Sequence, residues 1–281
     1  MEACKCKFYK PLFFGGLISF FLLLLQLMGC AEVPITHRRG LHLVPESELL
    51  TMSFQQYSEV LQKSKLSNNT QQVEMVRRVG NRIAKSAEAF LAESGQQSSI
   101  KNYKWEFNLI EDDKTVNAWV MPGGKAAVYT GILHYTQNET GLAVVLGHEV
   151  AHALADHGNE RMSEALVANM GGMALSVALS SNSQQTQQLF MTVFGVGANV
   201  GFLLPYSRLH ESEADRIGLT LMARAGYDPR EAIPFWERMS KQEGKSRPPE
   251  FLSTHPATET RIADIKKYIP EAMPYYKAPS K

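Results

Sequence analysis

The sequence predicts an α+β fold that is mainly helical, with a small β-sheet or hairpin beside one buried helix. Apolar residues recur at helical spacing along most of the chain from residue 46 onward, whereas residues 103–133 carry β-favouring residues. One later segment is apolar nearly all round, which is typical of a helix in the core. The chain has 281 residues and 44% hydrophobic content, as expected of a folded globular protein.

The amino terminus has the features of an export signal. A basic start is followed by an uncharged apolar run from Pro11 to Met28, and then by Gly29 and Cys30. The ending "LMGC" resembles the bacterial lipobox, which implies that residues 1–29 are a lipoprotein signal peptide and that Cys30 is lipidated. An uncleaved membrane anchor is the alternative, since about 18 apolar residues can just span a bilayer.

Lipidation at Cys30 would place the chain in the cell envelope. By resemblance to sorting rules, Ala31 after the cysteine implies an outer-membrane lipoprotein facing the periplasm, and anchoring in the inner membrane is the alternative. Cys4 and Cys6 would leave with the signal peptide, so no disulfide is expected in the mature chain. A formal net charge of +1 gives no reason to expect a nucleic-acid partner.

The mature chain is expected to begin with a tether at residues 30–45. Helical spacing over residues 46–94 then predicts two helices, separated by the polar stretch "KLSNNTQQ". Residues 103–133 predict strands, with the "MPGG" of residues 121–124 as a hairpin turn. No repeat or long linker divides residues 46–281, so a single domain is expected there.

A buried helix follows the strands. Thr136 and Glu139 have the T-x-x-E spacing of a capping box, which predicts a helix start, and Gly158 is the expected stop. The helix of about 20 residues between them is apolar nearly all round, so it is expected in the core.

Two apolar segments come next, at residues 165–180 and 189–204. They are short for membrane spans and rich in Gly, Ala and Ser, so core helices are the preferred interpretation and a membrane-dipping hairpin is the alternative. The rest of the chain is expected to be helical. One helix is opened by Asp228 and Pro229, and a last helix is opened by Pro256.

The buried helix carries the motif HExxH within "LGHEVAHALADHG". His148 and His152 are four residues apart and lie on one helical face, about 40° from each other, where two imidazoles can bind one zinc ion. Glu149 projects close enough to act as a general base on a zinc-activated water without being a ligand. Burying these groups without a partner would be costly, and a metal ion supplies the partner.

A catalytic zinc needs a third protein ligand, which the sequence offers downstream. The extended metzincin motif is excluded, since it needs Gly and His where the chain has Ala155 and Gly158. In "YSRLHESEADRIG", Glu211 and Asp215 share one helical face, which suits Glu211 as the ligand and Asp215 as an acceptor for a ligand histidine's other N–H. Glu213 is expected on the far side of that helix.

HExxH followed by E-x-x-x-D resembles the zinc metallopeptidase family of the type I CAAX prenyl protease, the heat-shock protease HtpX, BepA and LoiP. The similarity covers roughly residues 46–268, and the chain is most similar to compact lipoprotein members such as LoiP. The resemblance implies a zincin-like fold with a glutamate ligand. It also implies the following roles: one Zn²⁺ per chain bound by His148, His152 and Glu211, with Glu149 as general base and acid and Asp215 as an orienting residue.

The resemblance also draws attention to two further regions. His255, in "STHPATETRI", is implied to stabilise the oxyanion or to occupy the fourth coordination position of zinc, and the alternative is a histidine that merely precedes a helix. Residues 116–121 are the candidate edge strand for pairing with substrate backbone, and an ordinary core strand is the alternative. His157, beside the motif, is expected to be a helix-end residue and no ligand.

These features predict a membrane-anchored zinc-dependent endopeptidase that hydrolyses peptide bonds by metal-activated water. Its expected partners are protein or peptide substrates and, through the N-terminal lipid, the membrane. The resemblance alone implies a role in envelope protein quality control. The alternatives are a chaperone-like outer-membrane assembly factor with a resting, rarely active zinc site, which would meet the envelope assembly machinery, and a structural lipoprotein without metal.

Overall fold

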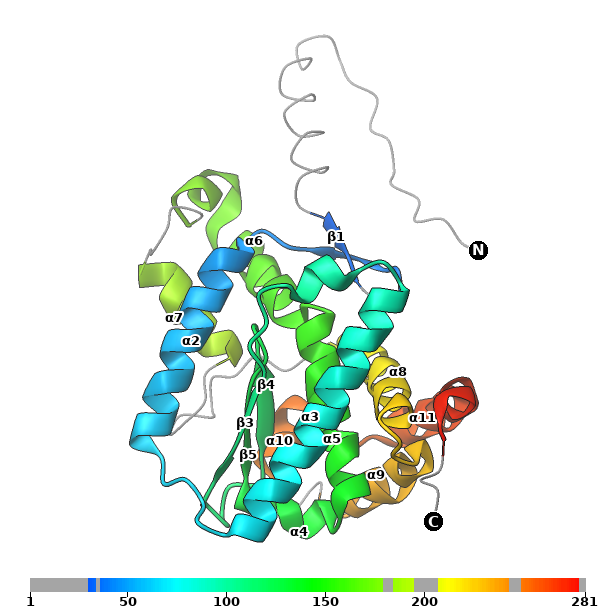
Figure 1. The fold of residues 1–281 in the computed structure, drawn as a ribbon. Coiled ribbons are helices and arrows are strands. Elements are labelled where there is room, and N and C mark those ends of the chain that lie inside the picture. Colours follow the sequence, from blue (N-terminus) through cyan, green and yellow to red (C-terminus); the bar gives the residue numbers. More distant parts are fainter. Residues whose placement is uncertain (1–29, 34–35, 179–183, 195–206, 243–248, 278–281) are drawn as a thin grey trace.

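The computed structural model describes residues 30–33, 36–178, 184–194, 207–242 and 249–277. Over these residues the fold is mainly helical with one three-stranded sheet and one short hairpin, which confirms the predicted fold class (Figure 1). Its helices and strands, in chain order, are β1 (Cys30–Glu32), β2 (Arg39–Leu41), α2 (Glu46–Lys63), α3 (Thr70–Glu93), β3 (Glu106–Ile110), β4 (Ala118–Met121), β5 (Lys125–Tyr129), α4 (Leu133–Thr136), α5 (Glu139–Leu154), α6 (His157–Ala178), α7 (Gln184–Phe194), α8 (Arg208–Arg224), α9 (Ala232–Ser240), α10 (Glu250–Thr254) and α11 (Glu259–Ala272).

Helices α2 and α3 are the two helices predicted for residues 46–94. Helix α3 begins inside the polar stretch, after Asn69, whose side chain accepts a hydrogen bond from the backbone N–H of Gln72 and so caps the helix. Val76, Val79 and Ile83 bury one face of α3 in the main core.

The sheet has the strand order β3-β5-β4, and β4 is an edge strand. Strands β4 and β5 form the predicted hairpin, with Gly123 and Gly124 at φ +83° and +81° in its turn, a backbone conformation that favours glycine. Strand β3 joins β5 in parallel. Because β4 packs against α5, the sheet supports one side of the central helix.

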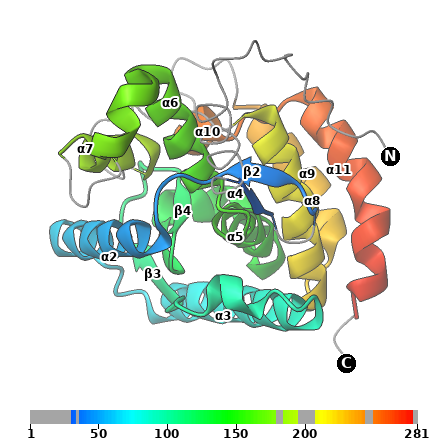
Figure 2. The same ribbon diagram turned by 90° about the horizontal axis from the view of Figure 1, so that it is seen from above.

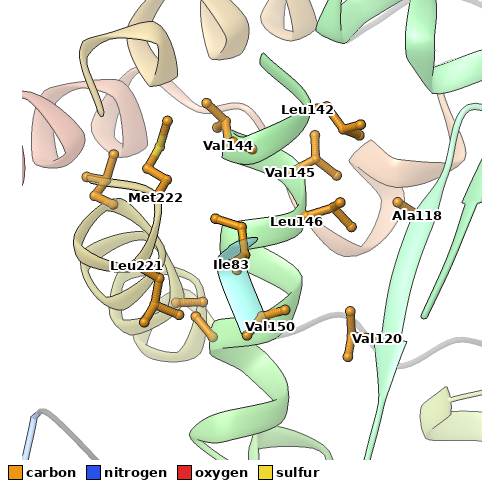
Figure 3. Packing of buried hydrophobic residues seen from close by; sticks show 14 of the residues in the cluster. Ile83, Ala118, Val120, Leu142, Val144, Val145, Leu146, Val150, Leu221 and Met222 are labelled. Atoms are coloured by element: carbon orange, nitrogen blue, oxygen red, sulfur yellow. The ribbon is translucent and has the colours of Figure 1, made fainter. Parts of the chain in front are cut away.

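Helix α5 lies at the centre of the molecule when it is seen from above (Figure 2). Every residue of α5 from Gly141 onward is buried. Figure 3 shows Leu142 and Leu146 on the side of the sheet, near Ala118, while Val144 lies on the side of Met222 from α8. Burial on all sides agrees with a helix that is apolar nearly all round.

The predicted ends of this helix were wrong. Thr136 ends α4, Gln137 takes a positive φ of 66° that interrupts the helical backbone, and Asn138 caps α5 by accepting from the backbone N–H of Thr140 and Gly141. The helix stops at Leu154 after 16 residues. The chain then turns through Asp156, at φ +53°, into α6, so Gly158 lies inside the next helix.

Helices α5 and α8 approach each other closely because glycines face each other at their crossing. A Cβ on Gly147 would lie 2.9 Å from the carbonyl oxygen of Gly218, and a Cβ on Gly218 would lie 2.9 Å from the backbone nitrogen of His148. These are backbone atoms, which cannot move aside as a flexible side chain can. The crossing therefore sets the distance between the two helices at the HExxH motif.

The two apolar segments fall on α6 and α7, which pack against each other. Residues 179–183 and 195–206, which belong partly to these segments, lie outside the described residues. Among the described helices, none combines the length and the apolar character that a membrane crossing requires.

Both ends of the described chain depart from the predicted elements. The last helix starts at Glu259 and is capped by Thr258 rather than opened by Pro256, and a short helix, α10, precedes it. At the other end, residues 30–45 contain the antiparallel hairpin of β1 and β2, which reaches α6, whereas a tether was expected. Residues 1–29, the predicted signal peptide, lie outside the described residues.

Candidate metal centre

Four buried side chains from three parts of the chain converge at one point. His148 and His152 come from α5, Glu211 comes from the first turn of α8, and His255 follows α10 directly. One nitrogen or oxygen atom of each lies within 4.8 Å of the others. These are the four residues that the sequence predicts as ligands or as the possible fourth ligand.

The distances between these atoms are those of ligands around a shared centre. The Nε2 atoms of His148 and His152 lie 2.9 Å apart, and Nε2 of His152 lies 3.2 Å from Oε1 of Glu211. Nδ1 of His255 lies 2.9 Å from the same Glu211 oxygen and 3.1 Å from Nε2 of His148. Imidazole nitrogens and a carboxylate oxygen are ligands that suit zinc, so the residues present fit this ion.

Glu149 lies beside the converging atoms. Its carboxylate is buried, and Oε1 makes no hydrogen bond within the described part of the chain. The same oxygen lies 3.4 Å from Nε2 of His255. Burial raises the pKa of Glu149, although His255 and His148 oppose this effect. A buried carboxylate with an open oxygen next to a ligand set is placed to accept a proton.

His148 is supported on the side of its Nδ1 atom by Asp215 and Arg261. Oδ1 of Asp215 lies 2.9 Å from Nδ1 of His148. Arg261, from α11, donates through Nε and Nη2 to both oxygens of Asp215, at 2.8 and 2.7 Å, and its Nη1 lies 2.7 Å from Oε2 of Glu211. The guanidinium also lies 3.5 Å above the ring of Trp236. One buried arginine thus joins two carboxylates of the site.

The positively charged groups around Glu211 favour the ionised form of its carboxyl. Burial opposes ionisation of its carboxyl, but His255 and Arg261 outweigh that effect and hold the pKa of Glu211 well below its usual range. Arg261 was missed in the prediction of site residues. The signal was present, since this arginine lies in "STHPATETRI", but nothing in that stretch tells which side chain turns inward.

His152 is supported by a residue that the sequence interpretation set aside. His157 is the first residue of α6 and is fully buried, and its Nδ1 lies 2.8 Å from Nδ1 of His152. Its Nε2 lies 3.0 Å from Oε2 of Glu213. The expectation of a mere helix-end position was therefore incomplete. Glu213 contacts His157 and Arg38 rather than the four converging side chains, and it is buried rather than solvated.

The structure thus brings together His148, Glu149, His152, Glu211, Asp215 and His255. The role of each stays a prediction. Cys30 is the first residue of β1, and its lipidation stays a prediction as well.

The predicted edge strand is only partly available for pairing. Residues 118–121 form β4, at the edge of the sheet beside α5. Just before it, the carbonyl of Val116 accepts a hydrogen bond from the backbone N–H of Phe251, and Asn117 donates to Glu250 at 3.0 Å. Helix α10 therefore covers the start of the edge and leads directly to His255.

Comparison with known proteins agrees with this geometry. Residues 71–269 match the sequence model of peptidase family M48. The chain is 40% identical to mitochondrial metalloendopeptidase OMA1 of Schizosaccharomyces pombe over 176 residues, which are 62% of this chain and 50% of that protein. It is 33% identical to the OMA1 of Saccharomyces cerevisiae over 276 residues, which cover 95% of this chain and 76% of that protein.

A bacterial relative shows a similar level of identity. The chain is 33% identical to the beta-barrel assembly-enhancing protease of Escherichia coli over 174 residues, or 60% of this chain and 35% of that protein. It spans about half the length of the S. pombe relative and about three quarters of the S. cerevisiae one. The family match covers both the HExxH helix and the helix of Glu211, and it confirms the resemblance seen in the sequence. The chain belongs to peptidase family M48, a family of zinc metallopeptidases.

Proposed function

We propose that this chain is a zinc-dependent endopeptidase, and one observation carries the proposal. His148, His152 and Glu211 present ligand atoms to one point from two crossing helices, beside the open carboxylate oxygen of Glu149. Three ligands of this kind with an adjacent carboxylate are the residue set of a hydrolytic zinc site. Membership of family M48 and the names of the yeast relatives support the same activity.

In the proposed reaction each residue has one task. His148, His152 and Glu211 hold a single Zn²⁺, which when bound lowers the pKa of a coordinated water to about 7. Glu149 accepts a proton from the attacking water and passes it to the nitrogen of the leaving amine. Asp215 accepts from Nδ1 of His148, which keeps Nε2 directed at the other ligands.

For His255 we propose the role of fourth ligand in a resting site. Its Nδ1 lies among the atoms of the other three ligands, which favours this role over that of an oxyanion donor. A catalytic zinc keeps one position open, so His255 must leave this place before a substrate binds. A closed resting site also favours the second candidate function, a chaperone-like assembly factor whose peptidase is rarely active.

The first experiment compares wild type with Glu149→Gln in the purified chain, using casein as substrate and measuring bound zinc. We expect casein cleavage to fall about 100-fold or more, with about one zinc per chain retained in both proteins. Equal cleavage by the two proteins would sink the peptidase proposal. If neither protein cleaves casein while both bind zinc, the assembly factor becomes the better candidate.

His255→Ala separates the two roles of His255. A resting ligand predicts that cleavage rises, while zinc stays bound through the three remaining ligands. An oxyanion donor predicts instead that kcat falls, because one donor to the developing charge is lost. The comparison is made at equal zinc content, so that a change in metal loading cannot imitate either result.

We further propose that residues 46–281 form one peptidase domain and that lipid on Cys30 anchors it to the outer membrane, facing the periplasm. The support is the sequence "LMGC" and a bacterial relative named for the assembly of β-barrels. A role in envelope protein quality control, on unassembled protein substrates near the membrane, fits these two observations. The test is metabolic labelling with a fatty-acid analogue. Label is expected in wild type and not in Cys30→Ser, and label in both would contradict the anchor.

A further inference from the structure

The contact between His152 and His157 has a defined chemical direction. Two ring nitrogens 2.8 Å apart form a hydrogen bond only when one of them carries a proton and the other does not. If Nε2 of His152 faces the metal, the proton of its neutral ring is on Nδ1, and His152 is the donor. His157 then accepts on Nδ1, so its own proton is on Nε2, which lies 3.0 Å from Oε2 of Glu213. Every atom in this chain of contacts has a partner of the right kind.

These contacts end at the carboxylate of Glu213, which is held by the N-terminal hairpin. Between β1 and β2, Arg38 donates through Nε to Oε2 of Glu213 at 2.8 Å, and Thr36 donates to the other oxygen. The guanidinium also donates from Nη1 and Nη2 to the two oxygens of Glu160, each at 2.7 Å. Glu213 and Glu160 are buried, and the Arg38 side chain is 19% exposed, so these contacts are largely removed from water.

The backbone of the hairpin is fitted to the same carboxylates. A Cβ on Gly40, in β2, would lie 2.9 Å from Oε2 of Glu160, so glycine allows the strand to approach. On the other side of Glu160, Nε2 of His210 lies 3.2 Å from Oε2. The ring of His210 stacks on that of His157, with the centroids 4.4 Å apart. The hairpin, α6 and α8 therefore meet in one buried polar cluster behind His152.

We infer that His157 is a positioning residue of the metal centre, which fixes the ring and the tautomer of His152, and that Arg38 of the N-terminal hairpin holds this support in place through Glu213. The inference rests on the proposed zinc site. A partner that accepts from the free N–H of a ligand histidine raises metal affinity about 10–100-fold. The hairpin that starts at Cys30 is therefore the outermost part of the metal centre, and zinc affinity depends on it.

The chain offers a matched control for His157. Asn159 lies two residues later on α6, is also buried, and also joins α6 to the N-terminal segment, since its side chain bonds the backbone N–H and C=O of Val44. No contact joins Asn159 to the four converging side chains in the described structure. Asn159→Ala should therefore destabilise the fold without changing the metal site.

The experiment measures zinc affinity in the full chain by competition with a chromophoric chelator. His157→Ala is expected to lower affinity about 10–100-fold relative to wild type, and Asn159→Ala to leave it unchanged. His157→Asn restores an acceptor oxygen near the position of Nδ1, so its affinity is expected between those of wild type and His157→Ala. The visible spectrum of the Co²⁺-substituted protein should shift in His157→Ala and not in Asn159→Ala.

A second pair of variants tests the hairpin. Arg38→Ala is expected to lower zinc affinity by a smaller factor than His157→Ala, because it acts through Glu213. Arg39→Ala, at the exposed neighbouring residue, is expected to match wild type. Wild-type zinc affinity and an unshifted cobalt spectrum in His157→Ala would overturn the inference as a whole. The same result in Arg38→Ala alone would overturn the part that concerns the hairpin.

A failure of this inference can be told apart from a failure of the proposed zinc site. If wild type binds no zinc, or if His148→Ala binds it as tightly as wild type, the proposed site itself is wrong. If wild type binds one zinc and His148→Ala loses it while His157→Ala does not weaken it, only the inference about His157 and Arg38 is wrong.

Discussion

His148 and His152 lie four residues apart on one helix, yet the structure supports them in different ways. His148 contacts the carboxylate of Asp215 directly, and the buried Arg261 holds that carboxylate. His152 reaches a carboxylate only through the ring of His157, and the arginine at the end comes from the N-terminal hairpin.

The two supports are built from different parts of the chain. The support of His148 is compact and uses the same two helices, α8 and α11, that position Glu211. The support of His152 needs α6, the far face of α8 and a segment more than a hundred residues earlier in the chain. The support of His148 therefore comes from the helices that also carry or contact Glu211, whereas the support of His152 depends on how the N-terminal segment folds onto α6 and α8.

The largest effect, loss of zinc binding, is expected to be the same for His148 and His152. His148→Ala and His152→Ala each remove a ligand, and each is expected to abolish binding of one zinc per chain. The measurement is metal content after dialysis at a fixed free-zinc concentration. Stoichiometric zinc in either variant would show that the two histidines are not equivalent ligands.

The next effect, on the free energy of unfolding, should differ between the supports of His148 and His152. Asp215→Ala leaves the buried Arg261 with Glu211 as its remaining carboxylate, so we expect the free energy of unfolding to fall by about 3–5 kcal/mol. His157→Ala removes a neutral group and is expected to cost about 1–3 kcal/mol. Urea denaturation in the presence of a chelator measures both without the contribution of metal binding. Equal losses would contradict a difference between the charged support of His148 and the neutral support of His152.

A smaller effect is expected at the helix crossing, which both sides share. In Gly218→Ala the new Cβ meets backbone atoms of α5, and the cost exceeds the gain in helix propensity, so a net loss of about 1–2 kcal/mol is expected. Zinc affinity should fall with it, since the crossing sets the distance between His148 and Glu211. Arg216→Ala, on an exposed part of α8, serves as control and should stay within about 1 kcal/mol of wild type.

The last effect is expected at Arg38, and it depends on pH. Burial opposes ionisation of Glu160 and Glu213. Hydrogen bonds outweigh this effect and lower the pKa of each carboxyl to about 2. For Glu160 they come from His210 and then Arg38, and for Glu213 from His157, then Thr36, then Arg38. Because these pKa values lie below the unfolded value, their stabilisation is fully present above roughly pH 4.5 and is lost as the pH falls toward 2.

Arg38→Ala should therefore differ most from wild type near neutral pH, by about 1–3 kcal/mol in the free energy of unfolding. The difference should shrink as the pH falls from roughly 4.5 toward 3, where the carboxylates begin to take up protons. Denaturation curves of both proteins in the presence of a chelator, from pH 7 to pH 3, give this difference. A gap that stays constant or widens toward low pH would contradict the ionic role of Arg38.

Local patterns in the sequence were sufficient for the architecture and for the candidate ligands that the structure brings together. Helical apolar spacing and β-favouring residues placed the first two helices and the hairpin. HExxH with a later E-x-x-x-D placed three candidate ligands and Asp215 on two helices. Such predictions succeed because helical periodicity relates residues three or four positions apart. The predicted ends of α5 and α11 were wrong because several nearby residues offer similar capping signals. The side-chain contacts of Asn138 and Thr258 decide where these two helices begin.

What the sequence determined by itself is the candidate chemistry: two imidazoles at helical spacing with a carboxylate between them, and a second carboxylate on a later helix. What only the tertiary structure decided is how these groups are held. Arg261, His157, Glu213 and Arg38 are ordinary polar residues in the sequence, and no periodicity connects a hairpin near residue 38 to a helix near residue 213. Their role arises because folding buries them together, and buried charges are stable only where other parts of the chain supply their partners.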